Sequence, residues 1–413
     1  MTDKVLGVAI DIGTTTIALH LTDMETNERL TTVSGINVQI PYGADVTSRI
    51  KYCAENGHGT LTKIIREQIN AMIKEACSST GMQTKNIEIV SIAANTIMQH
   101  LAAGYSPVDM GVAPFTPVSL FGEELPAWDD LPVAENATVY YTPAISAYVG
   151  GDITAGLMAA GFETIQDPAI FLDIGTNGEI VLKHKGTYYC CATAAGPAFE
   201  GAEITMGMAA VTGAVDHVKW KDGIEFSTID NAKAVGLCGS GLLDMLAVLL
   251  DTGAVDETGR LDRDRYWLTG QKREDQIPGT EREPSTTGED GVYITAGDIR
   301  KLQLAKAAIA AGIQVLLHFA GVSEAEIKLL ALAGGFGSYM DLNSAARIGL
   351  FPKSLLPAAK AFGNTAGEGA AMVLDQKDAG TRLDIIRAHC EYIELSTMTF
   401  FNDKFVDQMA FEE

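Results

Sequence analysis

Cysteine is scarce in this chain, and none of its six cysteines falls in a C-x-x-C pair. The four-cysteine spacing of a plant-type ferredoxin is therefore absent, and we expect no iron–sulfur cluster in this chain. The adjacent Cys190 and Cys191 are most simply two small apolar residues on a buried strand, and an iron–sulfur ligand role for this pair is the alternative. Free thiols indicate a reducing compartment, so we expect a cytoplasmic location.

Positive charge is also in short supply, because 30 lysines and arginines face 53 aspartates and glutamates. The net charge of -23 argues against a nucleic-acid or anionic-membrane partner. We expect no apolar run long enough to span a bilayer, and the N-terminal residues lack the basic and apolar regions of a signal peptide. The seven histidines have neither metal-ligand nor triad spacing, so none receives a role.

The length of 413 residues is large for a single core, so we expect two lobes, 1–165 and 166–413. The first includes a proline-rich segment, 105–135, where helix is excluded over most of the length. This segment is either an ordered loop packed on the first lobe or a surface that docks a partner. The second lobe carries a charged, turn-rich insertion at about 256–291 and a Gly- and Met-rich run, 194–213, which is either a close-packed helix or a mobile loop.

One short pattern occurs twice in the chain. Residues 7–19 predict a strand, a tight turn and a second strand, with Asp-Ile-Gly-Thr at 11–14. The same four residues recur at 173–176, inside a second run of this kind. Two copies of one acid-tipped hairpin predict two similar lobes that face each other.

The hairpin tips are suited to a phosphate chain, because loops of backbone N–H groups and hydroxyls can surround its oxygens. The predicted phosphate-binding residues are Gly13, Thr14, Thr15, Thr16, Gly175, Thr176 and Asn177. Asp11 and Asp173 would repel phosphate directly, so we expect both to act catalytically by orienting Mg²⁺ through water ligands. The alternative is two unrelated turns capped by aspartate.

Two further motifs follow expected strands. Gly334, Gly335, Phe336 and Gly337 come after a buried strand, where adjacent glycines let a flat ring approach the backbone. This motif is either an adenosine site or a tight strand–helix turn. Asp152 stands at an expected helix start, where it is either an N-cap or a catalytic carboxylate that orients an attacking or Mg²⁺-bound water.

Together, residues 8–19, 172–182 and 332–337 resemble the phosphate and adenosine motifs of the sugar-kinase, heat-shock-chaperone and actin superfamily. This resemblance implies an α/β fold with two ribonuclease-H-like lobes, the actin-like ATPase fold, and Mg-ATP in a cleft between them. The Gly-Gly-Asp ending at Asp152 resembles the Gly-Asp of carbohydrate kinases in that superfamily, whose aspartate is the catalytic base.

Residues 141–155, 194–202 and 299–306 more specifically resemble the reductive activators of corrinoid-dependent methyltransferases. The resemblance implies an ATPase that drives electron transfer to an inactive Co(II) corrinoid protein and restores Co(I). Members of that family usually carry an N-terminal two-iron two-sulfur ferredoxin-like domain, and this chain has neither that domain nor its cysteines. The expected iron–sulfur electron donor is therefore on a domain missing from this chain or on a separate protein.

Other functions stay open at this point. A small-molecule kinase of the same superfamily would transfer phosphate to a sugar or a carboxylic acid. A nucleotide-gated binding module of the chaperone type would bind peptides, but no separate peptide-binding domain follows the second lobe. The related activators of 2-hydroxyacyl-CoA dehydratases hold a four-iron cluster between subunits, which the cysteine spacing supports little. A homodimer is a further expectation.

Overall fold

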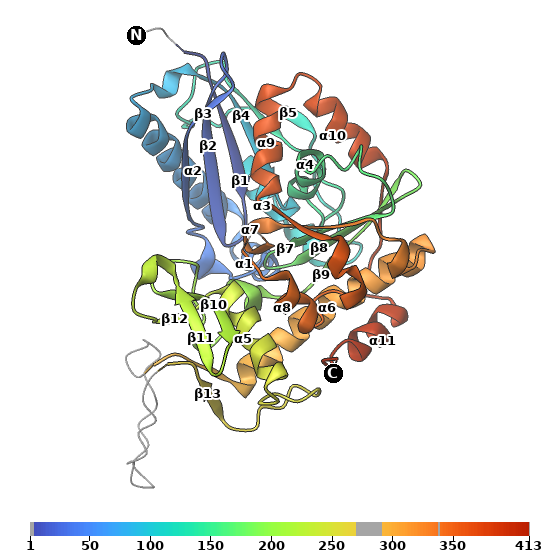
Figure 1. Ribbon diagram of the computed structural model, residues 1–413. Coiled ribbons are helices and arrows are strands. Elements are labelled where there is room, and N and C mark those ends of the chain that lie inside the picture. The colour runs from blue at the N-terminus through green and yellow to red at the C-terminus, as the bar shows by residue number, and fades with distance from the viewer. Residues whose placement is uncertain (1–3, 270–290, 338, 413) are drawn as a thin grey trace. The chain divides into compact units, whose positions relative to one another are not determined.

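The computed structural model describes residues 4–269, 291–337 and 339–412 and contains two compact units (Figure 1). The first unit takes the described residues of Met1–Phe171, Val181–Cys191 and Asn364–Ile393. The second takes those of Leu172–Ile180, Ala192–Gly363 and Glu394–Glu413. The C-terminal segment Asn364–Ile393 thus joins the first unit, which a single boundary at residue 165 does not anticipate. The division into lobes 1–165 and 166–413 stays a prediction.

The first unit is built on a six-stranded sheet of order β3-β2-β1-β4-β6-β5. Its strands are β1 Leu6–Ile12, β2 Thr16–Asp23, β3 Glu28–Ile36, β4 Ile87–Ala94, β5 Glu123–Pro126 and β6 Thr138–Tyr141. Its helices are α1 Val46–Asn56, α2 Gly59–Thr80, α3 Thr96–Ala103, α4 Gly151–Ala159, α9 Thr365–Asp375 and α10 Ala379–Ala388. Because β1 is antiparallel to β2 and parallel to β4, β1 and β4 present their carboxyl ends at the same edge.

The two faces of this sheet carry side chains of different size. Alternate residues of a strand point to opposite faces, so Val8 and Ile10 join the large apolar core that includes Ile65 of α2. Ala9 lies on the other face, in a cluster of small residues with Ala155 of α4 and residues of α9. Figure 1 shows α2 on one side of strands β1–β3 and α4 and α9 on the other. By the same alternation, Asp11 shares the face that α4 and α9 cover.

A second six-stranded sheet has the order β16-β15-β7-β8-β9-β17. Its strands are β7 Ala169–Ile174, β8 Gly178–His184, β9 Thr187–Thr193, β15 Leu329–Ala333, β16 Ala359–Gly363 and β17 Cys390–Tyr392. Five strands repeat the order of the first sheet, because β9-β8-β7-β15-β16 corresponds to β3-β2-β1-β4-β6. The hairpin β7–β8 therefore takes the place that β1–β2 has in the first sheet, as the repeated sequence pattern predicted.

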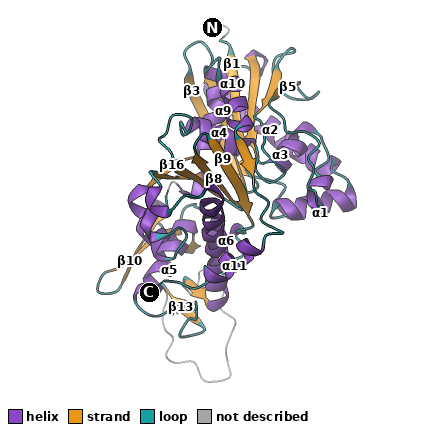
Figure 2. Cartoon of the chain, turned by 90° about the vertical axis from the view of Figure 1, so that its right-hand side faces the viewer, coloured by secondary structure: helices purple, strands orange, loops and turns teal. Residues whose placement is uncertain are grey.

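The second unit adds two small sheets and its own helices (Figure 2). The added strands are β10 Ala214–Trp220, β11 Ile224–Thr228, β12 Gly236–Leu237, β13 Arg265–Trp267 and β14 Tyr293–Thr295. The helices are α5 Gly239–Asp251, α6 Ala296–Ala320, α7 Gly334–Gly337, α8 Leu342–Arg347 and α11 Thr399–Asp407. Thr295 and Asp298 form a capping box at the start of α6, and α11 packs beside this helix.

Helix α6 requires one correction to the sequence expectation. By length and composition it could cross a membrane, with a mean hydropathy of 1.4 in its most apolar window. However, 78% of that window is buried inside the structure, which is the pattern of a core helix. The helix is therefore weak evidence for a membrane span, although its apolar run is long enough for one.

The proline-rich segment and the Gly- and Met-rich run both combine exposed stretches with buried side chains. Residues 105–132 contain a short 3-10 helix and β5, and both Phe121 and Trp128 are buried. Residues 194–213 are a loop with one 3-10 turn, in which Met206 is buried. Phe121 and Met206 are therefore core residues, which argues against direct contact of these two side chains with a partner. The charged segment 256–291 lies partly outside the described residues, which exclude 270–290.

Candidate functional site

The first predicted hairpin forms as expected. Its turn joins β1 and β2, where the Gly13 N–H donates to the Thr16 carbonyl at 2.9 Å. A side chain at Gly13 would lie 2.7 Å from that same oxygen, so the turn requires glycine. Thr14 is buried behind the turn, and Thr16 is exposed at the start of β2.

Residues distant in sequence hold this hairpin in place. The amide of Asn37 donates to the Gly13 carbonyl at 2.9 Å, and Arg49 Nη2 donates to the Thr14 carbonyl at 2.6 Å. Asn95, the N-cap of α3, donates to the Thr14 hydroxyl at 3.1 Å. Sequence reasoning assigned none of these three residues a role. The only signal for Asn95 was its position after a buried strand.

Asp11 occupies the end of β1, and its carboxylate meets the start of α9. Asn364 Nδ2 donates to Asp11 Oδ2 at 2.9 Å, while Asn364 Oδ1 caps α9 by accepting from Gly367 N at 3.0 Å. Burial raises the pKa of Asp11 to about 6, and the Asn364 hydrogen bond offsets part of this rise. A bound cation would relieve the cost of ionising this carboxyl.

Asp152 lies in the first turn of α4. The N-cap of that helix is Gly150, so the N-cap interpretation of Asp152 is wrong. Its Oδ1 accepts from Ile153 N at 2.9 Å. A side chain at Gly150 would lie 2.5 Å from the Cα of Asn95, so glycine lets the start of α4 pack directly on the β4–α3 junction behind Thr14.

The second hairpin, between β7 and β8, has its own acidic surroundings in the second unit. The Gly175 N–H donates to the Asn177 carbonyl at 2.9 Å. The Thr176 hydroxyl donates to Glu200 Oε2 at 2.8 Å, which ties the turn to the 3-10 helix Pro197–Glu200. Glu200 lies inside the 194–202 stretch that carries the family resemblance, but sequence reasoning gave it no role.

The glycine motif follows β15, as expected, and begins beside Asp173. Gly334 has a φ of +86°, and a side chain there would lie 2.5 Å from Asp173 Oδ1. At Gly335, by contrast, a Cβ would meet nothing within 4 Å, and this residue is exposed. Packing within the protein therefore explains why residue 334 is glycine. It does not explain the glycine at 335, whereas close approach of a ligand to the backbone would explain it.

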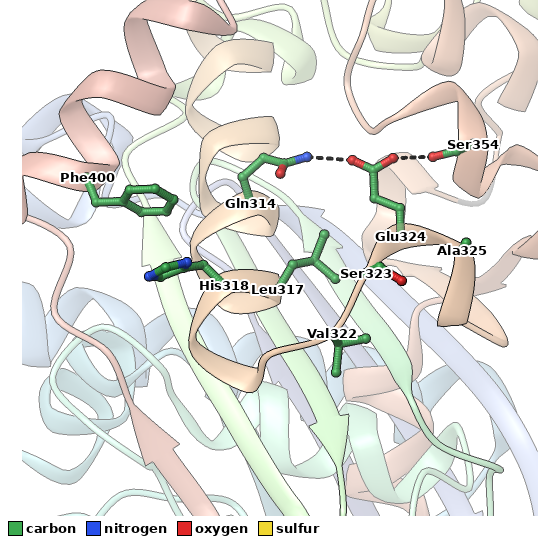
Figure 3. Close-up of a pocket in the computed structure, with 9 residues that line it drawn as sticks. All are labelled: Gln314, Leu317, His318, Val322, Ser323, Glu324, Ala325, Ser354 and Phe400. Carbon is green, nitrogen blue, oxygen red and sulfur yellow. Dashed lines mark hydrogen bonds between the residues drawn. The ribbon is translucent and has the colours of Figure 1, made fainter.

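A surface pocket of the second unit lies elsewhere (Figure 3). Glu324 accepts from Gln314 Nε2 at 2.7 Å and from the Ser354 hydroxyl, while the rings of His318 and Phe400 lie 4.5 Å apart between centroids. Glu324 precedes β15, so this pocket is at the opposite end of that strand from Gly334. It contains none of the predicted site residues.

The structure therefore groups the predicted residues within each unit. In the first unit, Asp11 and Thr14 gather with Asn95, Asn364 and the start of α4. The remaining predicted residues of that unit are Gly13, Thr15, Thr16 and Asp152. In the second unit, Asp173 adjoins Gly334, and Thr176 adjoins Glu200. The remaining predicted residues there are Gly175, Asn177, Gly335, Phe336 and Gly337.

Comparison with known proteins covers almost the whole chain. Residues 167–413 match the family model of the C-terminal domain of RACo, the ASKHA domain, and residues 6–165 match that of the RACo middle region. The corrinoid activation enzyme RamQ of Eubacterium limosum is 34% identical over 420 residues, which span 98% of this chain and 69% of that protein. A "[Co(II) methylated amine-specific corrinoid protein] reductase" of Methanosarcina barkeri is 24% identical over 440 residues, 98% of this chain and 77% of that protein.

A solved structure agrees with these matches. The reductive activator for corrinoid,iron-sulfur protein has a TM-score of 0.88 and 35% identity, covering 100% of this chain and 67% of that one. The duplicated sheet order and the two acid-tipped hairpins define a protein of the ASKHA class, the actin-like ATPase fold, which is a nucleotide-binding fold. Within that class, the chain belongs to the RACo family.

Proposed function

We propose that this protein is an ATPase that drives the reductive activation of a corrinoid protein. In the reaction, one electron passes from a reduced iron–sulfur donor to a Co(II) corrinoid, so that the donor is oxidised and cobalt reaches Co(I). The corrinoid protein belongs to a methyltransferase system. The donor is carried on another domain or on a separate protein.

The observation that carries this proposal is similarity along the entire chain to proteins named for corrinoid activation. The structural match includes every part of the chain at 35% identity, and RamQ is 34% identical over 98% of it. The matched stretch spans both hairpins and the glycine motif. The kinase alternative has no comparable support.

Within each unit, the predicted residues are suited to part of a nucleotide with Mg²⁺. Hairpin N–H groups and threonine hydroxyls would hold phosphate oxygens, and the open backbone at Gly335 would accept the adenosine. Asp11, which is partly buried with a raised pKa and an amide partner, would orient Mg²⁺ through water, and Asp173 would do the same from the second hairpin. Asp152 would position the attacking water.

The nucleotide is needed because forming Co(I) is uphill with ordinary cellular electron donors. A nucleotide that binds one arrangement of the protein more tightly than another shifts the population toward that arrangement. If only that arrangement binds the Co(II) partner well, ATP binding and hydrolysis gate the encounter and the release. Tighter binding of the Co(II) form than the Co(I) form then follows, since an activator must release its product.

Calorimetry with Mg-ATP is the first test. ATP should raise the melting temperature of the protein, because a ligand that binds only the native state stabilises it. We expect this rise in the presence of Mg²⁺ and not in its absence. A folded protein that binds neither ATP nor ADP would refute the proposal. Phosphoryl transfer to a sugar or a carboxylic acid, without any effect on a corrinoid protein, would instead favour the kinase alternative.

A further inference from the structure

Three polar side chains behind the first hairpin are completely buried. Asn37, Gln39 and Arg49 each have 0% of their surface exposed. A buried guanidinium is costly to desolvate unless its donors find acceptors. Burial of apolar surface therefore does not explain why an arginine lies at position 49.

The contacts of Arg49 reach from the hairpin to the following segment. Its Nη2 donates to the Thr14 carbonyl at 2.6 Å, its Nε to the Gly43 carbonyl at 3.0 Å and its Nη1 to Gln39 Oε1 at 3.1 Å. Nη1 also lies 3.1 Å from the Met98 sulfur. Within the described part of the chain, no carboxylate accepts a hydrogen bond from Arg49.

Three consecutive carbonyls of the hairpin are held by this network. Asn37 Nδ2 donates to the Gly13 carbonyl at 2.9 Å, and Arg49 donates to the Thr14 carbonyl. The backbone N–H of Asn37 donates to the Thr15 carbonyl at 2.8 Å. A peptide unit is planar and trans, so its N–H points away from its carbonyl. Anchoring the Thr14 carbonyl therefore fixes the direction of the Thr15 N–H.

Arg49 also keeps a positive charge directly behind the loop. Burial lowers its pKa to about 10, so the guanidinium is still charged at neutral pH. In a chain with a net charge of -23, this cation favours a bound phosphate. The charge of Asp45 acts on this guanidinium, but among the described residues no carboxylate lies at hydrogen-bonding distance from it.

We propose that Arg49 is the positioning residue of the first phosphate hairpin. It orients the N–H groups of the turn toward the phosphate chain and supplies a buried counter-charge, without touching the nucleotide. The inference rests on the proposed nucleotide-dependent function and adds a residue that this function did not require. Its signature is a loss of affinity specific to the phosphates.

Arg49→Met and the milder Arg49→Lys test this role by calorimetry with ATP and with adenosine. Arg49→Met should weaken ATP binding by about tenfold or more, the scale of one charge-assisted hydrogen bond. Adenosine affinity should stay unchanged, because adenosine has no phosphate. Arg49→Lys retains the charge but not all of the donors, so it should bind ATP between the wild type and Arg49→Met.

Lys183→Met is the matched control. Lys183 is another buried cation, and it donates to the backbone carbonyls of Phe162 at 2.8 Å, Glu163 at 3.2 Å and Ile165 at 2.8 Å. Its removal should lower the melting temperature without a change in ATP affinity. ATP binding by folded Arg49→Lys and Arg49→Met as tight as in the wild type, or an equal loss for ATP and adenosine, would overturn the inference. Absence of ATP binding by the wild type would instead refute the proposed function.

Discussion

Asp11 offers a test in which stability and function move in opposite directions. Its pKa is raised from 3.8 to about 6, so the native state holds this proton more tightly than the unfolded state does. The stabilisation that the protonated group gives is therefore present below pH 4 and is lost as the pH rises through 6. A shift of about 2 units corresponds to about 3 kcal/mol at pH 8, taken as an upper bound.

Asp11→Asn replaces the ionisable carboxyl with a neutral amide, which can still form a hydrogen bond with Asn364. Without nucleotide, we expect its free energy of unfolding at pH 8 to exceed that of the wild type by up to about 3 kcal/mol. The gain should fade toward pH 4, where the wild-type carboxyl is protonated. ATP turnover should fall by at least about a hundredfold, because a group that orients Mg²⁺ is lost.

Urea denaturation at several pH values and a phosphate-release assay measure the two effects. Asp23→Asn is the control, because Lys4 at 2.5 Å lowers the pKa of Asp23 and the same substitution there should destabilise at pH 8. A less stable Asp11→Asn at pH 8, or one with wild-type turnover, would show that the burial argument or the Mg²⁺ role is incorrect.

Three further substitutions separate packing from function. Gly335→Ala should leave the melting temperature unchanged, since a Cβ there meets nothing within 4 Å. In calorimetry it should weaken ATP binding by about tenfold or more, and unchanged affinity would exclude an adenosine contact. Asp152→Asn leaves the cap of α4 intact, because the N-cap is Gly150. It should lower the rate of hydrolysis by about a hundredfold or more with little change in ATP affinity. Equal losses in hydrolysis rate and ATP affinity would refute a water-positioning role. Phe121→Ala should cost about 3–5 kcal/mol in chemical denaturation, because its buried ring stacks on Tyr141 at 5.1 Å between centroids. Full stability with a loss of partner binding would contradict this assignment to the core.

The sequence predicted those parts of the site that are local in the chain. Both hairpins and the glycine motif stand at strand ends because period-2 apolar runs and glycine turns are short-range signals. The duplication of Asp-Ile-Gly-Thr at 11–14 and 173–176 also anticipated the repeated strand order of the two sheets.

Long-range partners could not be predicted in this way. Asn364 meets Asp11 across 353 residues, and Asn95 meets Thr14 across 81, so nothing in the local pattern connects them. Arg49 looks like an ordinary charged residue of a helix until the fold buries it. Aromatic and Met content likewise could not show that Phe121 and Met206 face the core.

If ATP drives the reduction of a corrinoid partner by this protein, Co(I) should form only when the nucleotide is present. Under anaerobic conditions, a candidate Co(II) corrinoid protein, a reduced iron–sulfur donor and Mg-ATP are combined, and the Co(II) and Co(I) absorbance bands are followed. We expect Co(I) to accumulate with ATP and the wild-type protein, and to stay near background with Asp11→Asn or without ATP. Equal Co(I) formation with and without ATP, across the corrinoid proteins of the source cell, would contradict the account.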